Sequence, residues 1–286
     1  MRTAIPRGAT ARSTGRVSYP PPAMPFDPSR DLDAAAAAAR KAVAAAAQAS
    51  LRHFRAGVVV ETKPDRTPVT AADRESEEAI VRELLAATPG ASVLGEEGGA
   101  RHGDPRTRWI VDPLDGTRGF TRGGSFWGPL VALEHDGEIL VGAAALPALG
   151  ETYWAARGRG AYRGEERLRV SGVADWDEAT LSLGEMRSLL ASASPEAVAL
   201  LGLVRSAAST RCYGDVAGAL MVLTGRAEAW IEGGVKIWDI APFKILFEEA
   251  GGRFTDLGGA PTVAGGSAVA TNGTLHEHVL SALRRG

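Results

Sequence analysis

Apolar and polar positions recur with several different periods along this chain, which predicts a protein that mixes helices with strands. An alanine-rich stretch from Asp31 to Arg55 favours helix by propensity, and Gly57 would end it. Asp31 or Asp33 would cap this helix at its N-terminus. Residues 1–30 are rich in Arg and Pro without a continuous apolar stretch, and they predict a disordered N-terminal extension.

Residues 58–85 predict a strand, a loop and a second helix. The strand covers Val58 to Thr62, and the two prolines of the next segment, Lys63 to Val69, predict a loop. A helix should open at Thr70, with acidic side chains in its early turns, where the helix dipole favours them. Its apolar face comprises Ile80, Val81, Leu84 and Leu85.

From residue 126 onward the pattern predicts a sheet and then alternating strands and helices. Apolar runs broken by turn residues indicate an antiparallel meander over 126–134, 138–146, 151–157 and 161–170. The second half predicts strands at 179–183, 227–232, 253–256 and 268–271, and a further strand that ends within Arg211 to Gly214. One helix is predicted to start at Ser194, and three further helices are predicted at 215–224, 239–250 and 275–284. These elements together predict a mixed α/β fold with helices covering the sheets.

Length, charge and cysteine content exclude some classes of protein. The 286 residues suffice for one large domain or two small ones. A formal net charge of −2 leaves no basic footprint for nucleic acid, and no segment approaches the roughly 20 apolar residues of a membrane helix. The single cysteine, Cys212, fits a reducing compartment, so we expect a cytoplasmic protein.

The clearest candidate for chemistry is the run Trp109-Ile-Val-Asp-Pro-Leu-Asp-Gly-Thr117. Pro113 keeps Asp112 extended, so this carboxylate should end a strand, after which the chain reverses. Asp115 lies on the other side of the turn. Gly116 and Thr117 would then open a helix, whose free amides favour an anion. A turn of this composition also reverses chains that bind nothing, so both interpretations remain open.

Further acids occur where a cation site would need them. Gly95-Glu96-Glu97-Gly98 places paired acids after an apolar segment, and Trp238-Asp239-Ile240 places one acid between large apolar residues. An unpaired carboxylate is costly to bury, and a cation would remove that cost. The oxygen ligands favour a hard divalent ion of the Mg²⁺ kind.

These motifs, in this order, resemble those of the Mg²⁺-dependent inositol monophosphatase family. The resemblance also covers Lys-Pro-Asp-Arg-Thr-Pro-Val-Thr-Ala-Ala-Asp at 63–73, and it extends to the C-terminus. It implies a layered α-β-α-β-α sandwich with the active site between its halves. Residues 31–286 would form one phosphatase domain, with a metal-site half at 31–170 and a substrate-pocket half at 171–286.

The resemblance also implies which residues carry the reaction. Two to three Mg²⁺ ions would be held by Glu96, Asp112, the Leu114 carbonyl, Asp115 and Asp239. The catalytic residues would be Asp73, Thr117 and Glu96, with Asp73 and Thr117 hydrogen-bonded to the attacking water. The substrate would contact Leu114, Asp115, Gly116, Thr117, Arg211, Gly214, Asp215, Val216, Glu232 and Asp239.

Two segments, Tyr213-Gly-Asp215 and Ala250-Gly-Gly-Arg-Phe-Thr-Asp256, look most like the histidinol-phosphate phosphatase branch of this family. Asp215 adds a carboxylate that suits a cationic alcohol, although it would equally serve as the cap of the helix it begins. We therefore expect a phosphomonoesterase that hydrolyses L-histidinol phosphate. Inositol 1-phosphate, a nucleotide or other sugar phosphate, and an inactive interaction module are the alternatives. The resemblance also implies a homodimer.

Overall fold

The computed structural model describes residues 25–57, 60–62, 68–191 and 195–284. Its helices are α1 (Pro28–Ala56), α2 (Ala71–Ala87), α3 (Thr117–Phe120), α4 (Met186–Leu189), α5 (Pro195–Ser206), α6 (Asp215–Leu223), α7 (Ile237–Ala250) and α8 (His276–Arg284). Its strands are β1 (Val60–Thr62), β2 (Pro68–Thr70), β3 (Ala91–Gly95), β4 (Gly99–Arg101), β5 (Asp104–Asp115), β6 (Gly128–His135), β7 (Glu138–Leu146), β8 (Glu151–Ala156), β9 (Gly160–Arg163), β10 (Glu166–Arg167), β11 (Thr180–Gly184), β12 (Ser209–Arg211), β13 (Ala229–Gly233), β14 (Arg253–Thr255) and β15 (Ser267–Thr271).

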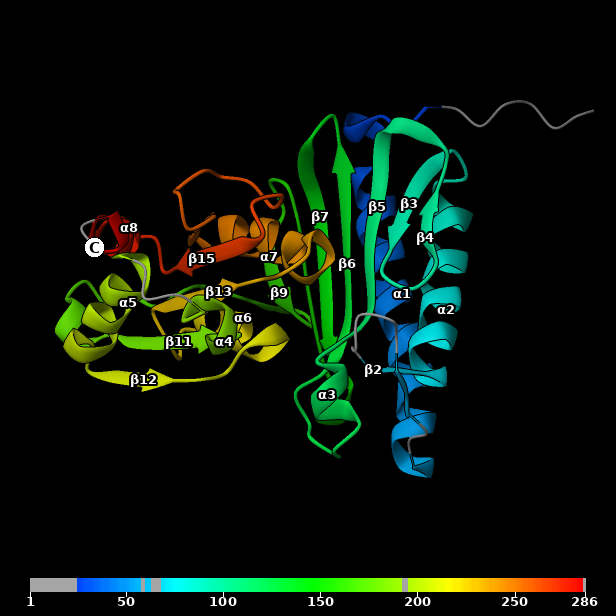
Figure 1. The fold of residues 1–286 in the computed structure, drawn as a ribbon. Coiled ribbons are helices and arrows are strands. Elements are labelled where there is room, and N and C mark those ends of the chain that lie inside the picture. Colours follow the sequence, from blue (N-terminus) through cyan, green and yellow to red (C-terminus); the bar gives the residue numbers. More distant parts are fainter. Residues whose placement is uncertain (1–24, 58–59, 63–67, 192–194, 285–286) are drawn as a thin grey trace, which may run out of the picture.

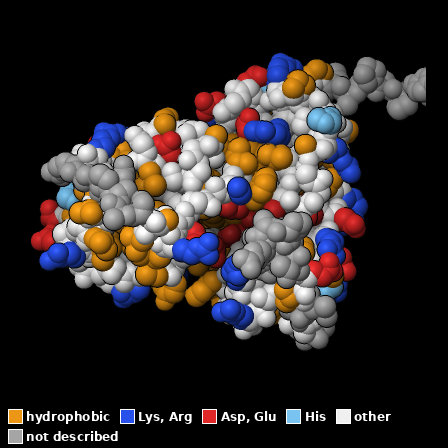
Figure 2. Space-filling model, in the orientation of Figure 1, with side chains coloured by type: hydrophobic (Ala, Val, Ile, Leu, Met, Phe, Trp, Pro, Cys, Tyr) orange, Lys and Arg blue, Asp and Glu red, His pale blue; other side chains and the backbone are white. Residues whose placement is uncertain are grey.

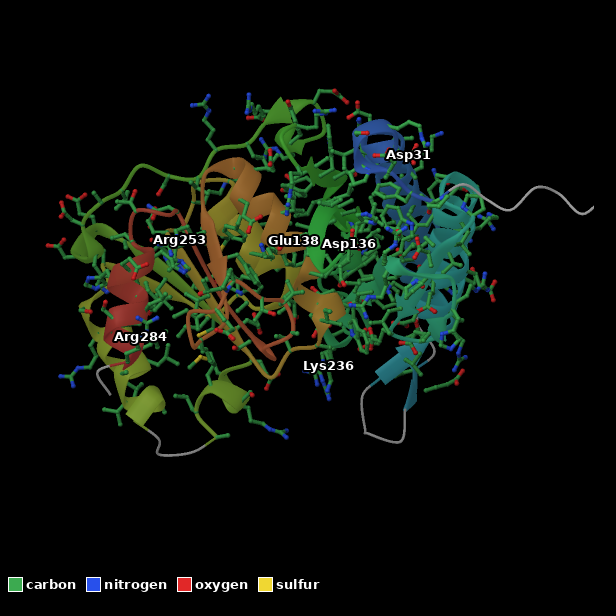
Figure 3. All side chains as sticks on the ribbon, turned by 90° about the horizontal axis from the view of Figure 1, so that it is seen from above. Asp31, Asp136, Glu138, Lys236, Arg253 and Arg284 are labelled. Atoms are coloured by element: carbon green, nitrogen blue, oxygen red, sulfur yellow. The ribbon has the colours of Figure 1, made fainter. Side chains whose placement is uncertain are left out.

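These elements stack as helices, sheet, helices, sheet and helices, which confirms the predicted mixed α/β sandwich (Figure 1). Helices α1 and α2 cover one face of an eight-stranded sheet, and α6 and α7 lie between that sheet and a five-stranded one. Helices α5 and α8 cover the outer face of the second sheet. Seen from above, the two sheets occupy separate sides of the molecule, with α7 between them (Figure 3). None of the described helices is long and apolar enough to cross a membrane.

Two predictions at the start of the chain were wrong in detail. The cap of α1 is Asp27, whose side chain accepts a hydrogen bond from the Ser29 amide at 2.9 Å, because Pro28 is pre-organised for the first helical position. Asp31 supports this start by accepting from the Asp27 amide, and Asp33 is no cap. The expected extension therefore ends before residue 28, and residues 1–24 lie outside the described part.

The loop expected at residues 63–69 is shorter than predicted. Pro68 begins β2, which pairs antiparallel with β1 in the register Thr62 opposite Pro68. Proline is tolerated at the first residue of such an edge strand, since no ladder hydrogen bond is lost there. Residues 58–59 and 63–67 lie outside the described part, so the rest of this prediction is untested.

The eight-stranded sheet has the order β10-β9-β8-β7-β6-β5-β3-β4 and contains the predicted meander. Its last predicted strand, 161–170, is instead two short strands joined at Gly164, whose φ of 58° requires a residue that accepts the left-handed conformation. Strand β3 runs parallel to β5, with Gly95 opposite Val111. The carboxyl ends of these two strands therefore lie next to each other.

The sequence predicted that this strand ends at Asp112, but β5 continues to Asp115. Its register against β6 shifts between Asp112 and Asp115, so Pro113 and Leu114 form an irregularity in the ladder. Proline has no amide to donate and is found in sheets at such bulges. The bulge keeps both carboxylates in one strand, and it adds one residue between them, since the three steps from Asp112 to Asp115 match only two on β6, from Leu130 to Gly128.

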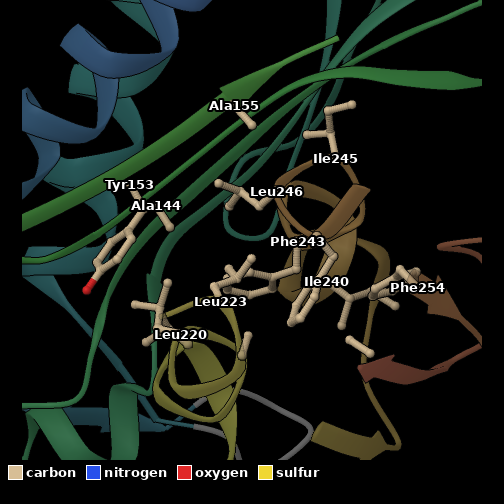
Figure 4. Close-up of a cluster of buried hydrophobic side chains, with 14 of the residues drawn as sticks. Ala144, Tyr153, Ala155, Leu220, Leu223, Ile240, Phe243, Ile245, Leu246 and Phe254 are labelled. Atoms are coloured by element: carbon tan, nitrogen blue, oxygen red, sulfur yellow. The ribbon is translucent and has the colours of Figure 1, made fainter. Parts of the chain in front are cut away.

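The five-stranded sheet has the order β12-β11-β13-β15-β14. Its first three strands are parallel, so Gly184, Arg211 and Gly233 end at the same edge. Between the two sheets, α6 and α7 bury Leu220, Leu223, Ile240, Phe243 and Leu246 against the strands of the first sheet and against β14 (Figure 4). This shared core joins the two halves and fixes the edge of the second sheet beside the end of β5.

Candidate active site

The metal-site residues predicted from the first half lie at the carboxyl ends of β3 and β5. Glu96 follows β3, and its amide donates to the Val111 carbonyl at 3.1 Å, which fastens the turn to β5. Asp112 lies near the end of β5 and Asp115 is its last residue, and both are buried. The parallel pairing of the two strands thus brings together acids that are separated in the sequence.

The second half adds Asp239 to this cluster. It is the third residue of α7, which begins two residues before the predicted start, and its carboxylate accepts from the Lys236 amide at 2.7 Å. Asp115 in turn accepts from the Val216 amide at the start of α6, at 2.5 Å. Figure 2 shows acidic side chains gathered in a hollow between the two halves, with Lys and Arg side chains at its border.

Burial and mutual repulsion make these carboxyl groups easy to protonate. Burial, followed by repulsion from Glu96, Asp115 and Asp239, raises the pKa of Asp112 well above its usual range. Burial and the nearby Asp215 do the same for Asp115. Burial also raises the pKa of Asp239, to about 7. Acids that repel one another in this way are stabilised by any cation that enters among them.

The donor set fits a hard divalent cation by chemistry and charge. One oxygen each of Asp112, Asp115 and Asp239 is held by a backbone amide, from Leu114, Val216 and Lys236, respectively. This arrangement leaves the second oxygen of each carboxylate for a ligand. Across the described ranges, however, no three Asp, Glu, His or Cys side chains converge tightly enough to form a finished metal site. Ion binding therefore requires some rotation of these side chains.

Asp73 and Thr117 lie together beside the cluster, as predicted. One oxygen of Asp73 accepts from the amide and the hydroxyl of Thr70, at 2.7 and 2.6 Å, and completes the capping box of α2. Its other oxygen lies 3.4 Å from the Thr117 hydroxyl, which is 2.9 Å from the Leu114 carbonyl. Burial raises the pKa of Asp73 above its ordinary value. Asp73 is therefore both the third-position member of the capping box and a candidate proton acceptor.

The candidate phosphate-binding turn depends on Gly116. This residue has a φ of 77°, and a Cβ there would lie 2.7 Å from the Phe126 carbonyl oxygen. Both facts demand glycine. The predicted helix that follows, α3, has a single turn, whose hydrogen bonds begin with the Gly119 and Phe120 amides donating to the Gly116 carbonyl. In such a turn the preceding amides, including that of Thr117, point away from the helix.

The predicted leaving-group residues lie at the carboxyl edge of the second sheet. Glu232 is buried and accepts from the Trp230 indole at 2.9 Å. Its carboxylate packs against Gly184, where a Cβ would lie 1.8 Å from its oxygen, and Gly214 lies against the same group. Burial, then repulsion from Asp215, raises the pKa of Glu232 to about 8.

Asp215 begins α6 in the left-handed conformation, with a φ of 53°, and its side chain is exposed. The alternative interpretation as a helix cap is wrong, because the N-cap is Gly214 and the first-turn amide of Val216 donates to Asp115 instead of Asp215. The side chain reaches solvent, but the surrounding protein still desolvates it in part. This desolvation, followed by repulsion from Glu185, raises the pKa of Asp215. Its carboxylate is therefore available to a ligand.

Arg211 differs from the other predicted residues in its orientation. Its exposed guanidinium turns back to the Ser209 hydroxyl and the Thr210 carbonyl, at 2.6 and 2.8 Å. The contribution of Arg211 to the pocket stays a prediction. Val216 contributes through its amide, which is already bound to Asp115.

Three residues near the site were not selected from the sequence. Glu185 follows Gly184 in a left-handed conformation, with a φ of 41°, and repels Asp215. Glu77 on α2 accepts from the Glu97 and Gly98 amides, at 2.9 and 2.6 Å, so it holds the turn that carries Glu96. Phe126 precedes the buried Trp127 beside Gly116. An acid after the end of a parallel strand is a signal that could have identified Glu185.

Comparison with known proteins gives a consistent result. The model of the inositol monophosphatase family matches residues 31–286. A histidinol-phosphatase of Mycobacterium tuberculosis is 42% identical over 232 residues, covering 79% of this chain and 88% of that protein. An inositol-1-monophosphatase of Mesorhizobium japonicum is 36% identical over 220 residues, covering 76% of this chain and 83% of that protein.

Among solved structures, the extragenic suppressor protein suhB of Bartonella henselae superimposes with a TM-score of 0.79 at 29% identity. The match covers 88% of this chain and 99% of that protein. The similarity in sequence and the similarity in fold to known proteins therefore both extend over nearly the whole described part of the chain.

Proposed function

Since the chain belongs to the inositol monophosphatase family and is a phosphoric monoester hydrolase, we propose that it hydrolyses L-histidinol phosphate with Mg²⁺. The products are L-histidinol and inorganic phosphate. The relatives support the reaction class more strongly than the substrate, because histidinol-phosphatases and inositol-1-monophosphatases both match. The choice between them rests on the residues that face the alcohol.

We propose that Glu96, Asp112, Asp115, Asp239 and the Leu114 carbonyl hold the Mg²⁺ ions. When bound, such ions neutralise charge on the phosphoryl oxygens and on the departing alkoxide. The raised pKa values of Asp112 and Asp115 support this role, because burial and repulsion by neighbouring carboxylates dominate the surroundings of both groups among the described residues. The bulge at Pro113 allows both Asp112 and Asp115 to contribute to the proposed metal site from one strand.

The remaining groups position the phosphate and the water. Gly116 and Thr117 present backbone amides at the start of α3, where a phosphate is favoured. The Thr117 hydroxyl and the Asp73 carboxylate together orient a water for attack at phosphorus. Asp73 accepts a proton from that water more readily because burial raises its pKa.

The observation that carries the choice of substrate is the acidic lining on the side of the alcohol. Asp215, Glu185 and Glu232 surround the carboxyl edge of the second sheet, and the pKa values of Asp215 and Glu232 are raised. A cationic alcohol entering there stabilises the ionised carboxylates. A neutral polyol offers only hydroxyl groups. L-Histidinol carries an amine and an imidazole and therefore fits this lining better than inositol does.

A comparison of two substrates tests this proposal. We expect kcat/KM for L-histidinol phosphate to exceed that for inositol 1-phosphate by about tenfold to a hundredfold, since a charge-assisted contact is worth roughly 1.5–3 kcal/mol. Asp215→Ser should remove most of this preference while hydrolysis of glycerol 2-phosphate continues. A kcat/KM for inositol 1-phosphate that equals or exceeds the value for histidinol phosphate would refute the substrate assignment.

A further inference from the structure

Two exposed aromatic rings meet next to residues of the candidate active site. Phe126 and Tyr213 pack edge to face, with ring centroids 5.7 Å apart and planes at 63°. Their exposed fractions are 49% and 41%, so much of each ring is open to solvent. Large apolar side chains in such a position are stabilised when a ligand covers them.

Both rings project from anchored backbone. Phe126 precedes Trp127, which is fully buried in a cluster with Leu114 and Phe120. The Phe126 carbonyl also lies against Gly116 in the phosphate-binding turn. The backbone that carries the first ring is therefore fixed relative to the place where a phosphate would bind.

Tyr213 is anchored from the other half of the molecule. Its carbonyl accepts from the buried Ser182 hydroxyl at 2.8 Å, and the following residue, Gly214, packs against Gly184 and Glu232. Asp215 comes next. The ring pair thus joins the phosphate side of the site to the acidic lining on the side of the alcohol.

Resting on the proposed function, we infer that Phe126 and Tyr213 form an aromatic wall for a flat ring in the leaving group. Aromatic rings pack well against other flat rings, and more strongly when the partner is cationic. Asp215 and Glu185, beside this wall, supply negative charge for such a ring. The preferred alcohols are therefore those that carry a planar, preferably cationic, ring within reach of the phosphate.

Four phosphomonoesters separate the contribution of the ring from that of the charge. L-Histidinol phosphate has both, 2-phenylethyl phosphate has only a ring, 2-aminoethyl phosphate has only a charge, and glycerol 2-phosphate has neither. Phe126→Leu and Tyr213→Leu keep apolar bulk without an aromatic face. Tyr213→Phe keeps the ring, and Leu201→Ala on α5 alters a side chain of matched exposure, 47%, away from the site.

We expect each leucine variant to raise KM about tenfold for the two substrates with rings, relative to the two without, at nearly constant kcat. Tyr213→Phe should retain the preference for rings, and Leu201→Ala should match the unaltered protein. An equal change of KM for all four substrates, or no change, would overturn the inference. So would a change of oligomeric state in sedimentation velocity without a selective effect on KM, because the rings would then form a contact between subunits.

These outcomes are independent of the substrate test above. If 2-phenylethyl phosphate loses affinity in the leucine variants while histidinol phosphate is no better than inositol 1-phosphate, the wall stands and the proposed substrate fails. If histidinol phosphate is preferred but the leucine variants bind both substrates with rings normally, the substrate stands and the wall fails.

Discussion

At the scale of single residues, the two oxygens of Asp73 have different tasks. One completes the capping box of α2 through Thr70, and the other faces Thr117. The capping contacts hold the carboxylate in one orientation but occupy only one of its two oxygens. Because the structural and chemical roles use separate atoms, substitution can distinguish them.

We expect Asp73→Asn and Thr117→Ala to lower kcat by on the order of 10²-fold or more with little change in Mg²⁺ affinity, since both residues orient the attacking water in the proposed mechanism. Thr117→Ser keeps the hydroxyl and should retain most activity. Asp239→Asn should instead weaken Mg²⁺ binding. Phosphate release and calorimetric Mg²⁺ titration check these expectations, and an equal loss of Mg²⁺ affinity in all variants would contradict the division of roles.

The raised pKa values also predict how stability depends on pH. Asp239 and Glu232 have pKa values of about 7 and about 8 in the folded protein, against ordinary values of 3.8 and 4.5. The folded state therefore binds more protons than the unfolded chain, and the free energy of unfolding falls as pH rises through this range. His276, whose pKa is lowered from 6.5 to about 4 by burial, acts in the opposite sense only below about pH 6.5.

In EDTA, the melting temperature should accordingly fall between roughly pH 6.5 and 8.5. Mg²⁺ should reduce this fall, because the ion compensates the carboxylates that deprotonate, and Glu232→Gln should reduce it without metal. Calorimetric melts across this range provide the measurement. A melting temperature that stays level or rises in EDTA would count against a cluster of mutually repelling acids.

At the scale of elements, helix α2 supports the turn between β3 and β4 through Glu77. Its buried carboxylate accepts hydrogen bonds from two amides of this turn, those of Glu97 and Gly98, which follow Glu96. Gly95 and Gly98 admit the carboxylate, since a Cβ on either would lie 2.7 and 2.4 Å from its oxygen, respectively. This contact positions the turn that carries Glu96, which is one of the expected metal ligands.

Glu77→Gln keeps the size of the side chain but presents an NH₂ group to one of the two amide donors. We expect it to weaken Mg²⁺ binding by about 10- to 100-fold, as for other groups that support metal ligands. Glu78→Gln, an exposed neighbour on the same helix, is the matched control. Calorimetric titration gives the affinities. A lower melting temperature with unchanged Mg²⁺ affinity would make the role of Glu77 purely structural.

The sequence predicted most elements but fewer of their ends. Periodicity located the meander and the alternating second half, since these signals are local. The continuation of β5 through Pro113 depends on pairing with β6, which no local signal reveals. The start of α1 at Pro28 and the start of α7 before Asp239 likewise depend on capping contacts. Tertiary and capping contacts thus determine where these helices and strands begin and end, which local sequence patterns do not show.

The candidate site followed the same division. Motifs identified the acids at the ends of strands, because those motifs are local. Glu77 and Glu185 were missed as site residues, since their importance depends on which turn or acid they face across the fold. The assembly of the site from two halves was implied by resemblance to a family and could not be derived from periodicity.

At the scale of the whole molecule, the site exists only where the two sheets meet. Asp115 on β5 holds the Val216 amide at the start of α6, and Asp239 enters from α7. The shared core of α6, α7 and the first sheet fixes this arrangement (Figure 4). A change in how the halves pack would separate the acids of one from those of the other, so activity should report on the packing of the sandwich.

The most direct test of this account is phosphate release from L-histidinol phosphate by the full-length chain and its Asp112→Asn variant, with Mg²⁺ and with EDTA. Asp112 is buried among the acids that repel it, so replacing it removes one expected ligand charge and should weaken the attraction for the ions. Asp136→Asn, in the exposed β6–β7 turn on the same sheet (Figure 3), is the matched control. We predict activity in Mg²⁺ for the unaltered chain and the control, and its loss in EDTA or in Asp112→Asn. Full activity of Asp112→Asn, or of the metal-stripped protein, would contradict the account.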